Sequence, residues 1–462
     1  MTPTIFALAT PAGRSGVAVI RISGPEAGAA LRALTRRELP EPRVATLRKF
    51  YTATPSDPSR LPSPSRGEGS TGLSQYSVPI DDGLALWFPA PASFTGEDIA
   101  ELHIHGGPAV IAAMLQALSH AGCRPAGPGD FTRRAFDNGK LDLTEVEGLA
   151  DLIAAETEAQ RRQALRQMEG EFGRRVETWR QALLVALARI EAAIDFPEED
   201  LPEGLAESVT DAMRIVADEI AMQLDDDHRG ERLREGLSVV ILGAPNAGKS
   251  SLLNRLAKRD AAIVSAEAGT TRDVIELQLD LDGYPVVLAD TAGLRESGNA
   301  VETEGVRRAL ARAARADLKI VVLDGKSWPE IPGASRALID DAAILVLNKA
   351  DLKNGGPFAV DGRAALPVST LTGAGLPQLL TELGRRCSHL LASGDQPALT
   401  RLRHRAALQD CLGFLGRGLE AAAVELKAED LRLASRALGR VTGRFDVEDV
   451  LDMIFREFCI GK

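Results

Sequence analysis

The residues best suited to chemistry lie in the segment Gly243-Ala-Pro-Asn-Ala-Gly-Lys-Ser250. Gly243 and Gly248 permit backbone angles and close approaches that other residues do not, so successive N–H groups can point toward phosphate oxygens. The ammonium of Lys249 can reach the outer phosphates, and the hydroxyl of Ser250 can bind Mg²⁺. The spacing therefore predicts a phosphate-binding loop for a nucleoside triphosphate. Its expected contacts are Asn246, Ala247, Gly248, Lys249, Ser250 and Ser251.

Two further segments belong with this loop. Asp290-Thr-Ala-Gly293 follows the apolar run 286–289, where an aspartate can support the magnesium ion and a glycine three residues later can respond to the γ-phosphate. We expect Asp290, Thr291, Ala292 and Gly293 to line the triphosphate. In Gly269-Thr-Thr-Arg-Asp273, which lies between these motifs, Thr271 can supply another oxygen to Mg²⁺.

The motif Asn348-Lys-Ala-Asp351, which follows the apolar run 343–347, indicates the base. An ionised Asp351 only accepts hydrogen bonds, so it matches the adjacent N1–H and N2–H₂ donors of guanine, whereas adenine would leave its lone pairs unpaired. We therefore predict GTP as the nucleotide. Its base would contact Asn348, Lys349 and Asp351, with Ser369 contributing through its backbone.

One residue expected for GTP hydrolysis is missing. Ras-like GTPases place a glutamine directly after the Asp-x-x-Gly motif to orient the attacking water, but here the position holds Leu294. Hydrolysis is therefore either very slow or depends on an arginine, a monovalent cation or a carboxylate that stabilises the transition state. The nearby charged candidates are Arg295, Glu296, Glu302 and Glu304.

Composition narrows the class of protein. A chain of 462 residues predicts two to four domains, and a hydrophobic content of 45% with only 4% aromatics favours a helix-rich protein. A net charge of −11 argues against a surface that binds nucleic acid on all sides. The four cysteines lack paired or metal-ligand spacing, which suits a reducing compartment. With no basic leader and no apolar run of membrane-spanning length, we expect a cytoplasmic protein that does not bind membranes.

The pattern of apolar residues predicts three kinds of region. Short strands at 5–9, 17–22, 83–88 and 99–104 and a helix at 109–121 indicate an α+β domain over residues 1–138, with a solvated Pro/Ser/Gly-rich insertion at 54–74. Amphipathic helices follow at 139–235 and again at 386–462. The expected fold is therefore multidomain α/β and α: an N-terminal α+β domain and a helical bundle domain, with a Ras-like P-loop GTPase domain at 236–385 inserted into the bundle.

Several segments together resemble one family. They are Thr10-Pro-Ala-Gly-Arg-Ser-Gly-Val-Ala-Val-Ile-Arg-Ile-Ser-Gly24, Ser93-Phe-Thr-Gly-Glu-Asp98, His105-Gly-Gly-Pro108, Pro128-Gly-Asp-Phe-Thr-Arg-Arg-Ala-Phe136, Lys140-Leu-Asp-Leu143 and the closing Phe458-Cys-Ile-Gly-Lys462. In this order they resemble the MnmE, or TrmE, family of tRNA modification GTPases, over essentially the whole chain outside 54–74. The closing Cys-Ile-Gly-Lys is the most specific of them.

The resemblance implies a homodimeric GTPase that works with the FAD-dependent protein MnmG, also called GidA, in a heterotetrameric or larger complex. FAD would enter only through that partner. Together they would add a carboxymethylaminomethyl or aminomethyl group to carbon 5 of the wobble uridine of certain tRNAs. The one-carbon donor would be a formyl- or methylene-tetrahydrofolate. The family's folate ligands map onto Arg21, Glu101, Lys140 and Lys462, near the dimer interface.

The resemblance also implies how hydrolysis proceeds without the glutamine. The family's GTPase domains use K⁺ and dimerise across the nucleotide face. Asn246 would bind K⁺ through its side chain, with oxygens from Ser265, Glu267 and Thr270. Glu267 stands where an apolar residue is expected, which matters little if its backbone carbonyl is the ligand. Glu302 maps onto the carboxylate that acts as general base or orients water through a bridging water.

Some interpretations stay open. Cys459, beside Lys462, is compatible with a thiolate nucleophile and equally with an inert thiol. Four arginines at helical spacing, Arg432, Arg436, Arg440 and Arg444, could meet tRNA phosphates or pair within the chain. His103 and His105 have no third ligand, and we predict no zinc. The alternative functions are a ribosome-assembly GTPase, for which a basic balance would be expected, and a GTP-switch scaffold without a chemical role.

Overall fold

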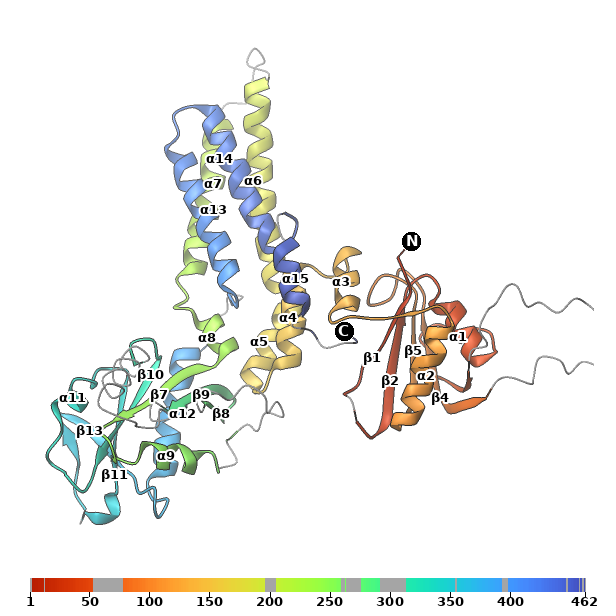
Figure 1. Cartoon of the computed structure of the whole chain (residues 1–462). Coiled ribbons are helices and arrows are strands. Elements are labelled where there is room, and N and C mark those ends of the chain that lie inside the picture. Colours follow the sequence, from red (N-terminus) through yellow and green to blue (C-terminus); the bar gives the residue numbers. More distant parts are fainter. Residues whose placement is uncertain are drawn as a thin grey trace, which may run out of the picture. The chain divides into compact units, whose positions relative to one another are not determined.

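The computed structural model describes residues 2–11, 13–52, 78–195, 205–258, 262, 276–290, 313–353, 355–392, 398–445, 448–456, 458 and 461. The chain forms two compact units, one made of Met1–Ala150 with Thr442–Lys462 and the other of Asp151–Val441. Figure 1 shows the elements coloured along the chain.

The first unit is built on a six-stranded sheet in the order β3-β4-β5-β2-β1-β6. The central strands alternate, so that Ala18, Ile20 and Ile22 of β2 are buried beneath helices while Val17 and Arg21 face the other way. Helices α1 and α2 pack on the buried face (Figure 1). The bounds are β1 (Ile5–Leu8), β2 (Ser15–Ser23), α1 (Ala27–Thr35), β3 (Thr46–Tyr51), β4 (Pro79–Phe88), β5 (Ile99–Gly106), α2 (Pro108–His120) and β6 (Arg124–Pro125).

The same unit joins the two ends of the chain. Leu143 and Val146 of α4 (Leu143–Ala154) share a small apolar core with Phe455 of α15 (Glu448–Arg456) and with Phe458. Helix α3 (Asp130–Asp137) lies against α15. The close packing needs glycine at position 129, because a Cβ there would lie 2.5 Å from the Phe455 carbonyl oxygen. Helix α15 is thereby held against α3 and α4.

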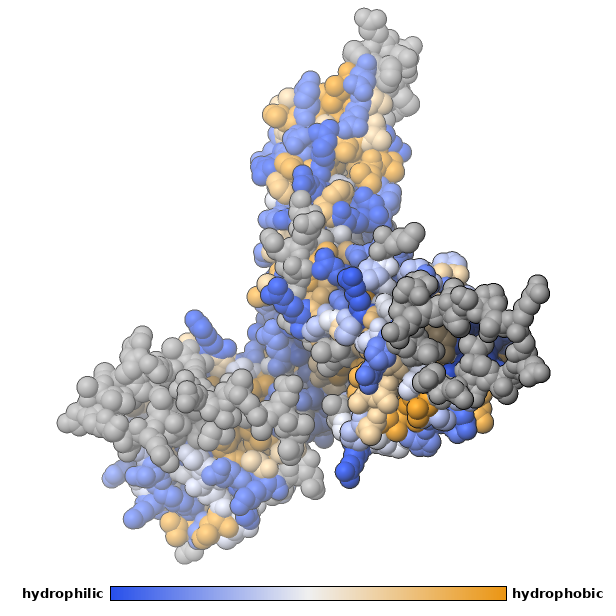
Figure 2. All heavy atoms as spheres, turned by 45° about the vertical axis from the view of Figure 1, so that its right-hand side comes forward, coloured by the Kyte–Doolittle hydropathy of each residue, from blue (hydrophilic) through white to orange (hydrophobic). Residues whose placement is uncertain are grey.

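The second unit contains the helical bundle. Helices α6 (Glu171–Asp195), α7 (Leu205–Leu224), α13 (Leu402–Glu420) and α14 (Val424–Val441) surround a core of leucines, small residues and Trp179. Helix α5 (Glu158–Met168) begins at a capping box in which the Thr157 hydroxyl and Gln160 exchange hydrogen bonds with the first turn. On the face seen in Figure 2, hydrophilic and hydrophobic side chains are interspersed over the bundle.

A buried ion pair ties the bundle to helix α8 (Arg229–Glu235), which leads into the next domain. Arg405 of α13 donates from Nε and Nη2 to the two Glu231 carboxylate oxygens at 2.9 and 3.1 Å. Its Nη2 also contacts Asp226 Oδ1 at 2.5 Å, and its Nη1 donates to the Leu224 carbonyl. This network joins segments that lie before and after the inserted domain in the sequence.

The inserted domain is a seven-stranded sheet in the order β12-β13-β11-β10-β7-β9-β8. Strands β7, β9, β10, β11 and β13 are parallel neighbours, and β8 and β12 pair antiparallel at the edges. The bounds are β7 (Leu237–Gly243), α9 (Lys249–Leu256), β8 (Glu276–Leu281), β9 (Tyr284–Asp290), β10 (Leu318–Asp324), α11 (Gly333–Arg336), β11 (Ala343–Asn348), η2 (Ala350–Leu352), β12 (Ala359–Val360), β13 (Arg363–Pro367) and α12 (Leu376–Leu391).

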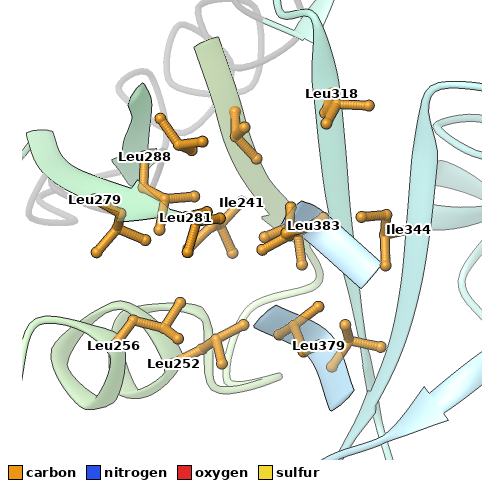
Figure 3. Close-up of a cluster of buried hydrophobic side chains, with 14 of the residues drawn as sticks. Ile241, Leu252, Leu256, Leu279, Leu281, Leu288, Leu318, Ile344, Leu379 and Leu383 are labelled. Atoms are coloured by element: carbon orange, nitrogen blue, oxygen red, sulfur yellow. The ribbon is translucent and has the colours of Figure 1, made fainter. Parts of the chain in front are cut away.

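The core of this domain lies between the sheet and helices α9 and α12. Ile241 and Leu288 from the central strands meet Leu252 of α9 and Leu383 of α12 (Figure 3). The parallel sheet with helices on it, the helical bundle and the N-terminal α+β domain confirm the predicted fold class. Among the helices that the structure describes, none combines the length and apolar content needed to cross a membrane.

Candidate functional site

The carboxyl ends of four parallel strands bring the predicted nucleotide residues to one edge of the sheet. β7 ends at Gly243, β9 at Asp290, β10 at Asp324 and β11 at Asn348. Their registers align these ends, since Val322 pairs with Gly243 and Asp324 pairs with Asn348. In open parallel sheets, ligands bind outside this edge.

The predicted phosphate-binding loop connects β7 to α9 without a gap. Gly243 has φ 144° and a Cβ there would lie 2.3 Å from the Val322 carbonyl oxygen. Gly248 caps α9 with φ 96°, and a Cβ there would lie 2.1 Å from Asn348 Nδ2. Asn246 adopts φ 61° between them, a left-handed conformation that asparagine tolerates better than most residues. The loop backbone therefore requires both glycines where the sequence has them.

The polar groups of the loop are placed for a ligand. Lys249 Nζ donates to the carbonyls of Gly243 and Ala244, both at 3.0 Å, so its ammonium lies over the loop. Asn246, Ser250 and Ser251 are exposed, while Ala247 is buried under the loop. Ser250 lies in the first turn of α9, where the helix dipole favours anions. This arrangement can hold a phosphate chain.

The base motif at the end of β11 holds the phosphate loop that follows β7, across the intervening strand β10. Asn348 is 1% exposed, and its Nδ2 donates to the Ala247 carbonyl at 2.8 Å while its Oδ1 accepts from Thr370 N. Lys349 Nζ donates to the Asn246 carbonyl at 2.9 Å. The two side chains therefore hold two consecutive carbonyls of the loop.

The remaining base residues lie around this clamp. Asp351 is exposed in η2, so its carboxylate is accessible to a base. Ser369 is buried, and its Oγ accepts from Thr372 N while its own N–H donates to the Ala374 carbonyl. These bonds shape the loop that precedes α12; the contact of Ser369 with the base stays a prediction.

Asp324 is a site residue that the sequence reasoning missed. Its carboxylate forms an ion pair with Lys349 Nζ at 2.7 Å and accepts from Lys326 N. Burial alone would raise the pKa of Asp324, but the hydrogen bonds and charge of Lys349, together with Lys326 N, outweigh it and lower the pKa. A signal was present, since Asp324 follows the apolar run 320–323 as Asp290 follows 286–289.

Several predicted residues lie outside the described part of the chain. For Asp290 the structure gives the backbone position alone, paired with Ile241 of β7. The others are Ser265, Glu267, Thr270, Thr271, Thr291, Ala292, Gly293, Leu294, Arg295, Glu296, Glu302, Glu304, Cys459 and Lys462.

A second polar cluster lies on the sheet face of the first unit that α1 and α2 do not cover. Arg21 of β2 pairs with Glu101 of β5 in register, with Nε to Oε1 at 3.0 Å. His103 Nε2 lies 3.5 Å from Glu101 Oε2; it is buried and lacks a hydrogen-bond partner in the described chain. The Arg21 guanidinium also lies 5.9 Å from the Phe94 ring centroid. The side chains of Arg21 and Glu101 stay partly exposed, at 23% and 19%, so a polar ligand can reach this pair.

One further predicted member, Lys140, lies beside the loop 93–98. Lys140 is exposed, and its side-chain carbons lie beside Gly96, where a Cβ would be 3.4 Å from Lys140 Cε. The loop is held by Ser23 Oγ to Thr95 Oγ1 at 2.8 Å and by Asn138 Nδ2 to the Thr95 carbonyl at 2.7 Å. Gly461 packs on the backbone of β1 and the residue after it, which places the C-terminal segment one strand from Arg21.

Other candidate groups are internally paired or inert. Arg432 pairs with Glu191, Arg440 pairs with Asp410, and Arg436 and Arg444 also have partners. This arginine face is therefore paired within the chain. Burial raises the pKa of the Cys123 thiol to about 11 and those of Cys387 and Cys411 to about 12, so these thiols are unreactive at neutral pH.

In the second unit, a cavity of about 300 Å³ is lined by residues of α5, the start of α6 and the start of β9. Its polar lining is satisfied within the chain: Arg166 pairs with Glu171, and Thr400 Oγ1 donates to Gln167 Oε1. It therefore offers few unpaired groups to a ligand. Within the described residues, no group of three or more His, Cys, Asp or Glu side chains is arranged to hold a metal ion.

Comparisons with known proteins find one family along the chain. Residues 4–140 match the family described as GTP-binding protein TrmE N-terminus, and residues 143–459 match the MnmE helical domain. A protein of Paramagnetospirillum magneticum named tRNA modification GTPase MnmE is 54% identical over 100% of both chains. One of Parvibaculum lavamentivorans with the same name is 56% identical over 99% of this chain and 100% of its own. Among solved structures, the G domain of the T. maritima FeoB iron transporter is 26% identical, covers 33% of this chain and 98% of its own, and has a TM-score of 0.24.

Proposed function

The chain belongs to the MnmE family of tRNA modification GTPases, and from this premise we propose that it hydrolyses GTP with K⁺ as the activating cation while serving wobble-uridine modification with MnmG. The observation that carries the proposal is the clamp between the base motif and the phosphate loop. Asn348 and Lys349 hold the carbonyls of Ala247 and Asn246, so the segments that would bind guanine and phosphate form one rigid site.

We assign roles in GTP binding by the chemistry of each group. Lys249 balances the charge of the outer phosphates, and the loop from Asn246 to Ser251 contributes N–H groups and hydroxyls. Asp351 accepts from guanine N1–H and N2–H₂. Mg²⁺, when bound, would neutralise charge on the phosphates, held by Ser250 and Thr271 with support from Asp290. We assign contact with the γ-phosphate to Thr291, Ala292 and Gly293.

The potassium part of the proposal explains Leu294. K⁺, when bound, would supply positive charge that other GTPases take from an arginine. Asn246 is exposed in the phosphate loop, as its proposed role requires. Ser265, Glu267 and Thr270 would complete the site, and Glu302 would orient the attacking water through a second water.

The folate part of the proposal rests on the N-terminal cluster. Glu101 can accept from the amino and ring N–H groups of a pterin, while Arg21, Lys140 and Lys462 can hold its oxygens or carboxylates. The partly exposed pair of Arg21 and Glu101 fits such a ligand. The position of Gly461 supports a role for the neighbouring Lys462.

The same sheet face supports the proposed homodimer. Leu47 and Leu84 pair across β3 and β4 on this face and are 71% and 38% exposed, and Val17 nearby is 54% exposed. Exposed apolar side chains on a sheet face that α1 and α2 do not cover are typical of an interaction surface. Two copies meeting there would bury these side chains beside the folate cluster.

Cys459 is the cysteine that we propose for the modification chemistry, because the other three thiols are buried with raised pKa values. MnmG, with its FAD, would supply the redox chemistry, and the folate would supply the one-carbon unit. The variant Cys459→Ser tests whether the Cys459 thiolate attacks a carbon centre. Full tRNA modification by this variant would show that Cys459 is not the nucleophile.

Three measurements test the proposal. Wild-type GTP hydrolysis should be several-fold faster in KCl than in NaCl, and Asn246→Ala should abolish the difference. A tetrahydrofolate should bind the full chain and bind Arg21→Ala more weakly. Nucleoside analysis of cells lacking the chain should show unmodified wobble uridine that wild type restores. GTP hydrolysis with normal wobble uridine in those cells would favour a switch protein of another pathway.

A further inference from the structure

Lys349 turns back onto the phosphate loop and is held there by Asp324. Its Nζ lies 2.9 Å from the Asn246 carbonyl oxygen and 2.7 Å from Asp324 Oδ2. Asp324 is itself fixed, because its carboxylate accepts from Lys326 N at 2.9 Å. Both side chains of the pair are partly buried, with 32% and 19% of their surface exposed. The ammonium is therefore directed at one carbonyl.

The carbonyl that it holds belongs to a strained part of the loop. Asn246 has φ 61° and Lys349 has φ 58°, in a region that residues other than glycine rarely adopt. Such a conformation persists only when surrounding contacts impose it. The next carbonyl, that of Ala247, is held by Asn348 Nδ2 at 2.8 Å. Of these two contacts, only the bond from Asn348 to the Ala247 carbonyl would remain if the Lys349 contact were removed.

The charges also matter for a cation at this loop. An ammonium beside Asn246 would repel a cation bound to the same residue, and a carboxylate on that ammonium offsets the repulsion. Asp324 supplies it, and its lowered pKa keeps it ionised at neutral pH. Lys349 thus orients the loop while the pair as a whole adds no net charge.

We propose that Asp324 is a positioning residue that acts through Lys349 to fix the Asn246 carbonyl, and so couples the guanine motif to the cation-binding conformation of the phosphate loop. The effect on the loop can be measured without nucleotide, whereas the effect on K⁺ rests on the function proposed above. Because coupling between sites is reciprocal, loosening this contact should weaken K⁺ activation without removing the groups that contact GTP.

The first test uses the protein in NaCl without nucleotide. Hydrogen exchange, measured by mass spectrometry on a peptide covering residues 243–250, should be at least about fivefold faster in Asp324→Asn than in wild type, as loss of one hydrogen-bonded contact predicts. Lys349→Met should give the same increase, and the double variant should add nothing further. Asp340→Asn is the matched control, because it removes the Lys319–Asp340 pair at the other end of β10. Equal exchange in Asp324→Asn and Asp340→Asn would overturn the proposal.

The second test measures activation by K⁺. Asp324→Asn should need at least about fivefold more K⁺ for half-maximal GTP hydrolysis, with the rate at saturating K⁺ within about twofold of wild type. Asp340→Asn should match wild type. If wild type hydrolyses GTP equally in KCl and NaCl, the potassium part of the proposed function fails, while the exchange measurement still decides whether Asp324 anchors the loop. If wild type responds to K⁺ and Asp324→Asn responds identically, the coupling proposed here is wrong.

Discussion

Arg405→Met should destabilise the packing of helix α8 on the bundle more than the same substitution at an exposed arginine. Arg405 and Glu231 side chains are each 8% exposed, and Asp226 is 19% exposed. Methionine keeps much of the side-chain volume but removes the bidentate contact to Glu231, the contact to Asp226 and the bond to the Leu224 carbonyl. A buried carboxylate would then lack its cation.

The expected cost follows from that burial. Breaking a buried ion pair by removing one partner costs about 3–5 kcal/mol, because the other charge stays buried and unpaired. A change of about 1.4 kcal/mol is tenfold, so local opening should become roughly two to four orders of magnitude more frequent. Hydrogen exchange followed by mass spectrometry on peptides from α8 and α13 measures this opening directly.

Arg417→Met is the matched control on the same helix. Arg417 pairs with Asp430 at 2.8 Å, but its side chain is 59% exposed, and exposed pairs contribute at most about 1 kcal/mol. Adding Glu231→Met to Arg405→Met should recover part of the loss, since the uncompensated charge is gone. If the amides of α8 and α13 exchanged at the same rate in Arg405→Met and in Arg417→Met, burial of the ion pair would not explain its contribution.

The remaining predictions concern the nucleotide site and the sheet of the first unit. Gly243→Ala should weaken GDP binding at least about a hundredfold in a titration, because its Cβ would lie 2.3 Å from the Val322 carbonyl. Asp351→Asn should lose at least about a hundredfold in GTP affinity and gain preference for xanthosine triphosphate, which presents an acceptor where guanine presents an amine; unchanged selectivity would contradict its role. Burial would raise the pKa of Asp81, but hydrogen bonds from His105 outweigh it and lower the pKa below 3.8. The ionised Asp81 therefore stabilises the folded protein above pH 3.8. This contribution is lost as the pH falls through the pKa of the folded state. The melting temperatures of wild type and Asp81→Asn should therefore differ at neutral pH and converge in acid.

Much of the nucleotide site could be predicted because its chemistry is local. The glycines, Lys249 and Ser250 act within one turn between a strand and a helix, and the observed φ angles of Gly243 and Gly248 show why those positions need glycine. Apolar runs located β7, β9 and β11 for the same reason, since each is short, buried and continuous. The order of strands in the sheet was not readable in this way.

The sequence by itself determined the GTP-binding motif, the preference for guanine that Asp351 indicates and the family. The tertiary structure decided which distant groups meet. Asp324, Lys349 and Asn246 come from three strand ends, and they touch because β10 lies between β7 and β11 in a set register. Arg405 meets Glu231 from 174 residues away. Such contacts depend on how separate elements pack, which no local pattern of residues encodes.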